Sequence, residues 1–250
     1  MQFSLFPKSI VDDLGPVGSG ATAPRWIRAD DGLSYIVKDE ANGVASVRAS
    51  EYMWLSIARL ISLPAPIPEI FVNGQHRKLV GTRREQSTID AAVHVQALLS
   101  GRVLRGGVQL SRIFAFDLFC ANWDRHPANY LVLEDGASSI VVFAIDFSHV
   151  TAHPGLTRTN LDPLISLANA TRMQFPQVIQ PYGPDSQAAI EVVDRLSSLP
   201  IGAVNAILSE IPDDWLPAPE KAAVSAWWAS QARIDRATSL KQGFQNGTLI

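Results

Sequence analysis

Two acidic side chains and one amide in the middle of the chain have the types and spacing of a metal-binding set. Asp124 and Asn129 are five residues apart, and Pro127 between them prevents a continuous helix. Asp146 follows at the end of the apolar run Ile140–Ile145. Carboxylate and amide oxygens are hard ligands that suit Mg²⁺, with phosphate oxygens completing its coordination. The pattern therefore predicts a magnesium and phosphate site between a loop and a strand end.

A second set of residues, nearer the N-terminus, could bind phosphate. Lys38 ends a strand-like stretch, and Glu51 follows at the start of a helix-like stretch where the two could pair. Upstream lies a glycine-rich loop, whose backbone N–H groups could surround a phosphate. The loop consists of Gly18, Ser19, Gly20, Ala21 and Thr22. A phosphate clamp, metal ligands and a carboxylate that orients a hydroxyl are the parts that phosphoryl transfer needs.

These motifs resemble the HipA-like kinases. The stretch from Phe116 to Asn129 is similar to their catalytic loop, and the order Asp124-Arg125-His126 is shared with the phosphatidylinositol 3/4-kinases. The glycine-rich loop with Pro24 resembles the phosphate loop of the HipA group. The resemblance covers roughly residues 15–215. The Asp-Arg-His-x-x-Asn core followed by a later Asp is the specific part, because a glycine-rich loop alone is a weak signal.

Carried over by position, the resemblance implies roles for single residues. Asp124 would be the catalytic base, and Lys38 would contact the nucleotide phosphates during catalysis. Asn129 and Asp146 would hold Mg²⁺.

The resemblance also implies how ATP is bound and how the enzyme is regulated. Residues 18–22 would cover the nucleotide phosphates, with Glu51 supporting Lys38. Autophosphorylation would fall on Ser19 or Thr22 and expel the loop. One departure is Ser148, which stands where conventional protein kinases have glycine and would limit the motion of the following segment.

Hydrophobic patterning predicts an α+β fold, and the resemblance makes it the two-lobed protein-kinase-like type, with a strand-rich N-lobe (1–85) and a helical C-lobe (86–250). Residues 1–13 show no strong pattern, and 14–24 are expected to form a loop. Strands are expected at 26–28, 34–38, 70–72, 78–80, 131–133 and 140–145. Helices are expected at 46–62, 87–99, 108–121, 162–170, 185–197, 200–210 and 219–241.

Composition excludes several classes of protein. The chain has 250 residues, of which 47% are hydrophobic, so a sizeable core is available and disorder is not expected. The net charge of −3 gives no basic excess for direct nucleic-acid binding. The single cysteine, Cys120, excludes an intrachain disulfide. No signal peptide or membrane span is visible, so a cytoplasmic protein is expected.

Several alternatives remain open at this stage. Asp124 and Arg125 could form only a surface ion pair, and His149 with His153 could bind zinc, although Pro154 argues against an ordered helical pair. The favoured activity is ATP- and Mg²⁺-dependent transfer to a hydroxyl, with Ser or Thr of a protein as acceptor. The alternatives are a lipid or small-molecule kinase and a nucleotide-binding pseudokinase that acts as an interaction or antitoxin-like module. A toxin–antitoxin partner is considered as well.

Overall fold

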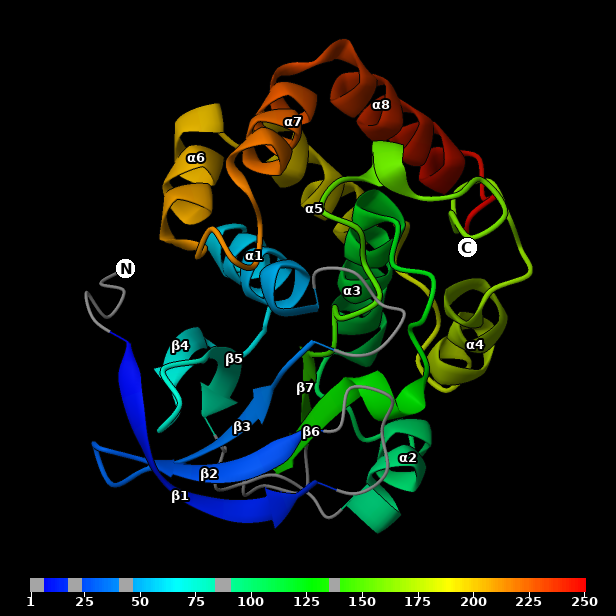
Figure 1. Cartoon of the computed structure of the whole chain (residues 1–250). Helices are drawn as coiled ribbons and strands as arrows, with labels where there is room; N and C mark the ends of the chain where they lie inside the picture. Colours follow the sequence, from blue (N-terminus) through cyan, green and yellow to red (C-terminus); the bar gives the residue numbers. More distant parts are fainter. Residues whose placement is uncertain (1–6, 18–23, 41–46, 84–90, 135–139) are drawn as a thin grey trace.

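The structure is a computed structural model that describes residues 7–17, 24–40, 47–83, 91–134 and 140–250. A closed five-stranded barrel occupies one side of the molecule, and helices stack on the other side (Figure 1). The fold is therefore mixed α and β, as the sequence predicts.

The barrel has the strand order β1-β2-β3-β5-β4, and it closes where β1 pairs with β4 in parallel. Its strands are β1 (Lys8–Pro16), β2 (Arg25–Ala29), β3 (Ser34–Lys38), β4 (Pro68–Val72) and β5 (Lys78–Arg83). Both predicted hairpins, β2–β3 and β4–β5, are confirmed.

Strand β1 is the element that sequence analysis missed. Residues 8–13 showed no strong pattern and 14–16 were expected to lie in a loop, yet all belong to this strand. Its pairing with β2 is irregular between Ile10 and Asp12 and again between Asp13 and Gly15. These irregularities break the inside–outside alternation by which a strand is recognised in a sequence.

Inward-facing side chains of the other four strands form a small core inside the barrel. Tyr35 and Phe71 lie at its centre, with ring centroids 4.7 Å apart. Gly81 of β5 allows β3 to approach closely, because a Cβ at this position would lie 2.8 Å from the carbonyl oxygen of Ile36. The cluster consists of Ile27, Ala29, Tyr35, Val37, Phe71 and Leu79.

Helix α1 (Val47–Leu60) lies between the barrel and the remaining helices (Figure 1). It was predicted at 46–62, with one buried face. Every residue from Val47 to Ala58 is in fact buried, because α1 packs on β4 and β5 on one side and on α6 (Ile201–Glu210) on another. Its apolar side chains belong to the main core, which extends into the C-terminal helices.

The C-terminal part surrounds helix α3 (Gly106–Cys120), which packs against α5 and α8. A two-stranded sheet, β6 (Tyr130–Glu134) and β7 (Ile140–Ala144), lies beside it. The other helices are α2 (Ala91–Leu99), α4 (Ala170–Ile179), α5 (Ser186–Ser198), α7 (Ala218–Ala229) and α8 (Gln231–Gln245), with short 3-10 turns η1 (Pro127–Asn129) and η2 (Pro154–Leu156).

Two predicted helices in this part need correction. The helix expected at 162–170 is absent, and α4 begins at Ala170 because the side chain of Asn169 caps it by accepting a hydrogen bond from the backbone N–H of Arg172. The helix expected at 219–241 is two helices, since Ser230 leaves the helical conformation and separates α7 from α8.

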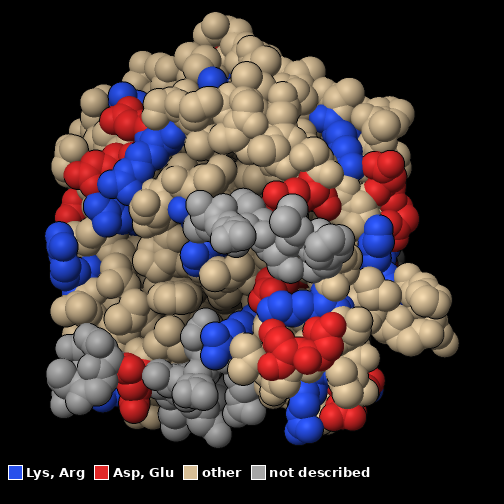
Figure 2. Space-filling view, turned by 90° about the vertical axis from the view of Figure 1, so that its left-hand side faces the viewer, with Lys and Arg blue, Asp and Glu red and all other residues tan. Residues whose placement is uncertain are grey.

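Charges on the surface are mixed. On the face shown in Figure 2, Lys and Arg side chains alternate with Asp and Glu rather than forming one large patch of a single sign. Exposed ion pairs on the barrel, such as Arg25–Asp13 and Arg28–Asp12, likewise join charges of opposite sign. Among the described residues, no helix is both long and apolar enough to cross a membrane.

Candidate active site

Lys38, Glu51 and Asp146 meet at one point of the structure. The Nζ atom of Lys38 donates to Glu51 Oε1 at 3.2 Å and to Asp146 Oδ1 at 2.8 Å. Lys38 ends β3, Glu51 lies in α1, and Asp146 follows β7 by two residues. The predicted pairing of Lys38 with Glu51 is therefore confirmed, and the same lysine also joins Asp146, a residue 108 positions later in the chain.

The backbone at Asp146 adopts a conformation that few non-glycine residues take. Its φ angle is +60°, in the left-handed region. Aspartate tolerates this region better than most residues, but the conformation still has an energetic cost. The turn ends the extended path of β7 and brings the carboxylate to Lys38. Backbone strain at a residue held by charged partners is typical of functional sites.

Ser148 completes this group of polar side chains. Its Oγ atom accepts a hydrogen bond from Lys38 Nζ at 3.1 Å and donates to Glu51 Oε2 at 3.3 Å. The backbone N–H of Phe147 donates to the same Glu51 oxygen at 2.7 Å. The serine that stands where conventional protein kinases have glycine is thus a buried link between the lysine and the glutamate. We call Lys38, Glu51, Asp146 and Ser148 the lysine site.

The lysine site holds one cation and two carboxyl groups, of which Glu51 is buried and Asp146 is partly exposed. Burial alone would lower the pKa of Lys38, but Glu51 and Asp146 raise it above its ordinary value. Although burial opposes ionisation of Asp146, Lys38 holds the pKa of that carboxyl far below its usual range. Burial raises the pKa of Glu51, and the nearby Asp146 charge adds to the effect. The contact of Lys38 with Asp146 is also the shorter of the two, at 2.8 Å against 3.2 Å for Glu51. A further cation near Glu51 would favour ionisation of that carboxyl.

The loop that carries Asp124 and Asn129 lies beside this group. Asn129 is buried, and its Nδ2 donates to the backbone carbonyl of Asp124 at 2.8 Å, so Oδ1 is the atom left to serve as a ligand. The Asp124 carboxylate is partly exposed, and its Oδ2 lies 3.7 Å from Nε2 of His149. The N–H of Ile145 donates to the carbonyl of Asn129, which joins the loop to the chain just before Asp146.

Arg125 does not form the surface ion pair with Asp124 that was considered. It is 2% exposed and pairs with Asp117 of α3, which is fully buried. Sequence reasoning missed this pair, although a single carboxylate inside the apolar stretch Phe114–Cys120 is a signal that could have found it. A charge in such a helix needs a buried partner.

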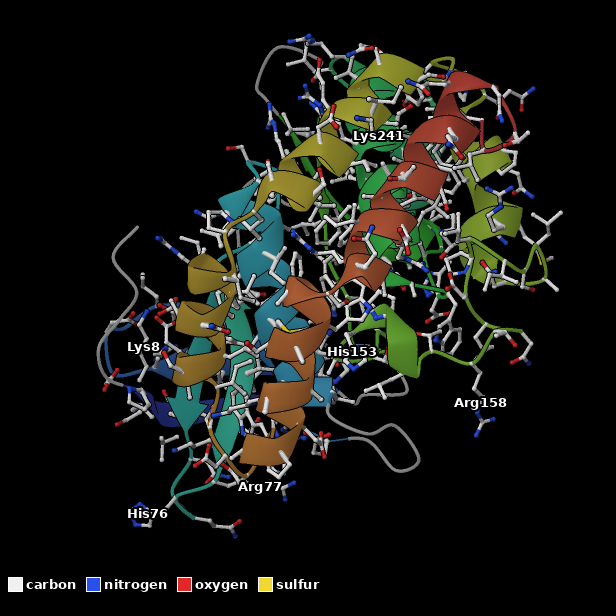
Figure 3. The ribbon with its side chains drawn as sticks, turned by 90° about the horizontal axis from the view of Figure 1, so that it is seen from above. Lys8, His76, Arg77, His153, Arg158 and Lys241 are labelled. Carbon is white, nitrogen blue, oxygen red and sulfur yellow. The ribbon has the colours of Figure 1, made fainter. Side chains whose placement is uncertain are left out.

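The zinc alternative finds no support in the geometry. His149 packs on Trp123, with ring centroids 5.1 Å apart, and His153, which Figure 3 labels, stacks on Trp227 of α7. No group of three or more His, Cys, Asp or Glu side chains suitable for a metal occurs in the described part of the chain. The predicted ligand pair of Asn129 and Asp146 is a different set, since it contains an amide and needs phosphate oxygens.

The predicted phosphate loop lies outside the described residues. Gly18, Ser19, Gly20, Ala21 and Thr22 all belong to this segment. The other predicted site residues are described, and the structure brings them into two adjoining groups. One group is Lys38, Glu51 and Asp146, and the other is Asp124 with Asn129.

Comparison with known proteins shows the fold. No protein-family model matches the chain, and no curated protein matches its sequence. The proinflammatory kinase CtkA of Helicobacter pylori is similar in structure, with a TM-score of 0.62 and 11% sequence identity, over 97% of this chain and 98% of that one. HipA of Shewanella oneidensis MR-1, from a toxin–antitoxin complex with HipB and operator DNA, has a TM-score of 0.54 and 12% identity, over 92% of this chain and 68% of that one. These likenesses support a HipA-like, kinase-like fold at low sequence identity.

Proposed function

We propose that the protein is an ATP- and Mg²⁺-dependent kinase that transfers the γ-phosphoryl group to a serine or threonine hydroxyl of a protein. The observation that carries the proposal is the contact of Lys38 with both Glu51 and Asp146. Three segments that are distant in sequence meet there, and their order along the chain, Lys38, Glu51 and then Asp146, is the order that the kinase resemblance implies. The likeness of the fold to CtkA, itself a kinase, supports the same reading.

The donor groups of the site suit a magnesium ion. Asp146 offers a carboxylate and Asn129 offers Oδ1, both oxygen ligands of the type that Mg²⁺ prefers. Two carboxyl groups share one lysine, so a divalent cation would offset the remaining negative charge. Bound Mg²⁺ supplies neutralisation of the charge that develops on the phosphate oxygens.

The side chains of the chain itself then have distinct tasks. Lys38 neutralises phosphate oxygens, and Glu51 keeps its ammonium group in place. Asp124, the partly exposed carboxylate, orients the acceptor hydroxyl and accepts its proton. Residues 18–22 cover the phosphates. In this proposal, 1–85 and 86–250 act as two lobes that bind the nucleotide between them.

The acceptor and partner follow from the same likenesses. We propose a protein acceptor, and a partner protein in the manner of HipA, whose structure was solved together with HipB. A comparison of phosphopeptides from cells that express the wild type or Asp124→Ala would identify the acceptor. Phosphopeptides that disappear with the variant would name the substrate, whereas phosphorylated lipid or small molecules alone would favour the alternative kinase class.

The central test is the Asp124→Ala variant with labelled ATP and Mg²⁺. Transfer to a protein acceptor should fall by about 10²–10⁴-fold, because the group that orients the hydroxyl is lost, while ATP binding persists. Asp213→Ala is a suitable control, since it removes an exposed carboxylate that pairs only with Lys221 among the described contacts. Equal rates for wild type and Asp124→Ala would overturn the assignment, and nucleotide binding without any transfer would indicate a pseudokinase.

A separate test addresses the metal ligand. Mg²⁺ and ATP together should raise the melting temperature of the wild type by a few degrees, since a hundredfold excess of ligand stabilises by ~2.7 kcal/mol. Asp146→Asn keeps the shape but removes the charge, so the Mg²⁺-dependent part of this rise should disappear. An identical rise in both proteins would show that Asp146 is not a ligand.

A further inference from the structure

The guanidinium group of Arg125 donates hydrogen bonds to a carboxylate on one side and to two backbone carbonyls on the other. Its Nε and Nη2 atoms donate to the two carboxylate oxygens of Asp117, at 2.8 and 2.9 Å. On the other side, Nη1 donates to the carbonyl oxygens of Asn129 and Ile145. Both ends of the planar fork are therefore engaged within the buried interior.

The two carbonyl groups belong to the segments that carry the proposed metal ligands. Asn129 is one ligand, and Ile145 directly precedes the other, Asp146. The guanidinium carbon also lies 5.5 Å from the ring centroid of Tyr130 and 4.9 Å from that of Phe147, which are the residues that follow each ligand. Hydrogen bonds and ring contacts thus hold the same two segments.

The backbone of Arg125 is fixed as well. Its N–H donates to Thr171 Oγ1 at 2.9 Å, and this hydroxyl donates to the carbonyl of Asn122 at 2.6 Å. Asn122 in turn donates from Nδ2 to Asp117 Oδ1 at 2.8 Å. The arginine is consequently anchored at both its main chain and its head group before it contacts the ligand segments.

We propose that Arg125, anchored by Asp117, is a positioning residue that sets the separation of Asn129 and Asp146 and thereby the affinity of the site for divalent metal. The inference rests on the proposed function, because that proposal assigns these two residues to the metal. Lysine cannot take over this task, since its single ammonium group lacks the planar fork that binds a carboxylate and two carbonyls together. Loss of such outer contacts typically weakens metal affinity about 10–100-fold.

The chain contains a matched control for the test. Arg236 of α8 donates from Nη1 and Nη2 to the two oxygens of Asp162, both at 2.7 Å. It also donates to the backbone carbonyls of Phe119 and Leu118. The chemistry is the same as at Arg125, one carboxylate and two carbonyls, but none of these partners is a proposed metal ligand.

The experiment compares Arg125→Lys with Arg236→Lys in the full-length protein. Binding of Mn²⁺ is followed by electron paramagnetic resonance in the presence of a non-hydrolysable ATP analogue, and the Mg²⁺ dependence of phosphoryl transfer is measured in parallel. Both variants should lose thermal stability, because each breaks a buried carboxylate fork. Only Arg125→Lys should weaken Mn²⁺ binding, by about tenfold or more, and raise the half-saturating Mg²⁺ concentration to the same extent.

A milder variant covers the case in which Arg125→Lys does not fold. Thr171→Val removes only the hydroxyl that holds the backbone of Arg125, so it should weaken Mn²⁺ binding several-fold in the same direction. Two outcomes would overturn the positioning role without affecting the proposed function. One is a metal affinity equal to wild type in every variant that folds, and the other is an equal loss of affinity in Arg125→Lys and Arg236→Lys. Tight Mn²⁺ binding by a wild type that transfers no phosphate would instead overturn the proposed kinase activity and leave the positioning role intact.

Discussion

Two lysine-centred clusters of nearly the same composition occur in this molecule. In the lysine site, Lys38 contacts a glutamate, an aspartate and a serine hydroxyl. In the barrel, Lys8 contacts Glu69 at 2.5 Å and Asp31 at 2.9 Å, and it also donates to the hydroxyl of Tyr35. We call Lys8, Asp31, Tyr35 and Glu69 the barrel cluster, and Figure 3 shows Lys8 on the barrel side of the molecule.

The two clusters differ in what they connect. All four residues of the barrel cluster come from the strands of the barrel and one of its turns, and none of the four has a left-handed φ angle. The lysine site joins the barrel, α1 and the segment after β7, and it includes the unfavourable φ angle of Asp146. Residue types alone therefore do not separate a structural cluster from a functional one. The convergence of three distant segments and the backbone strain at Asp146 make the lysine site the candidate functional cluster of the two.

The largest expected difference between the clusters is in activity. Lys38→Met should lower the rate of phosphoryl transfer roughly 10²–10³-fold, since a positioned cation at the phosphates is lost. Lys8→Met should leave the rate within about twofold of wild type. A cation accelerates the reaction only when it lies at the reacting atoms, and Lys8 contacts residues of the barrel instead. Initial rates at saturating ATP provide the measurement, and a comparable loss in both variants would erase the distinction.

The next effect concerns stability. Lys8→Met should lower the free energy of unfolding by about 1–3 kcal/mol, between the values for exposed and fully buried ion pairs, because Lys8 is partly buried. The urea midpoint of the two proteins gives this difference. A urea midpoint equal to that of the wild type would show that Lys8 does not contribute to the stability of the barrel.

Acid should reduce the stability that Asp31 contributes to the barrel cluster. Burial would raise the pKa of Asp31, but hydrogen bonds from Tyr35 and Lys8 lower it to about 2. A lowered pKa contributes stability above the unfolded value of about 3.9, and this contribution is lost as the pH falls from about 4 towards 2. Asp31→Asn should therefore flatten the acid limb of a plot of melting temperature against pH. An unchanged slope in that window would contradict the assignment.

The smallest expected effects are those of the two hydroxyl groups. Ser148→Ala and Tyr35→Phe each remove hydrogen bonds to a lysine and a carboxylate, so each should cost about 1 kcal/mol of stability. Only Ser148→Ala should also lower the transfer rate, by about three- to tenfold, because Lys38 is then less well oriented. Melting curves and initial rates on the same samples test both statements, and a rate loss in Tyr35→Phe alone would reverse the comparison.

Several residues of the candidate site could be predicted because their types, spacing and order along the chain are typical of a phosphate and metal site. Lys38 and Glu51 are charged residues at the end of a strand and in a helix, and their pairing followed from that order. The partner of Arg125 was not predicted. The lone carboxylate of Asp117 in an apolar stretch indicates that it needs a buried cation, but only the packing of α3 beside the loop shows that Arg125 is that cation. Sequence spacing does not contain such information.

The fold was predictable where hydrophobic periodicity was regular. Helix α1 and the two hairpins have clear patterns, so they were predicted within a few residues. Strand β1 has irregular pairing and mostly exposed residues, and its partner β4 is distant in sequence. Helix α4 was displaced because the cap at Asn169, rather than the apolar pattern, determines where it begins.

The burial of α1 from Val47 to Ala58 has a consequence for how the molecule unfolds. The helix packs on β4 and β5, while Tyr52 donates to Glu210 of α6 at 2.6 Å and Arg48 donates to the carbonyl of Lys78 at 2.7 Å. Neither the barrel nor the helical part can come apart without exposing an apolar side of α1. We therefore expect the two parts to unfold as a single cooperative unit, so that Lys38 and Asp146 separate together, at one temperature, when the protein melts.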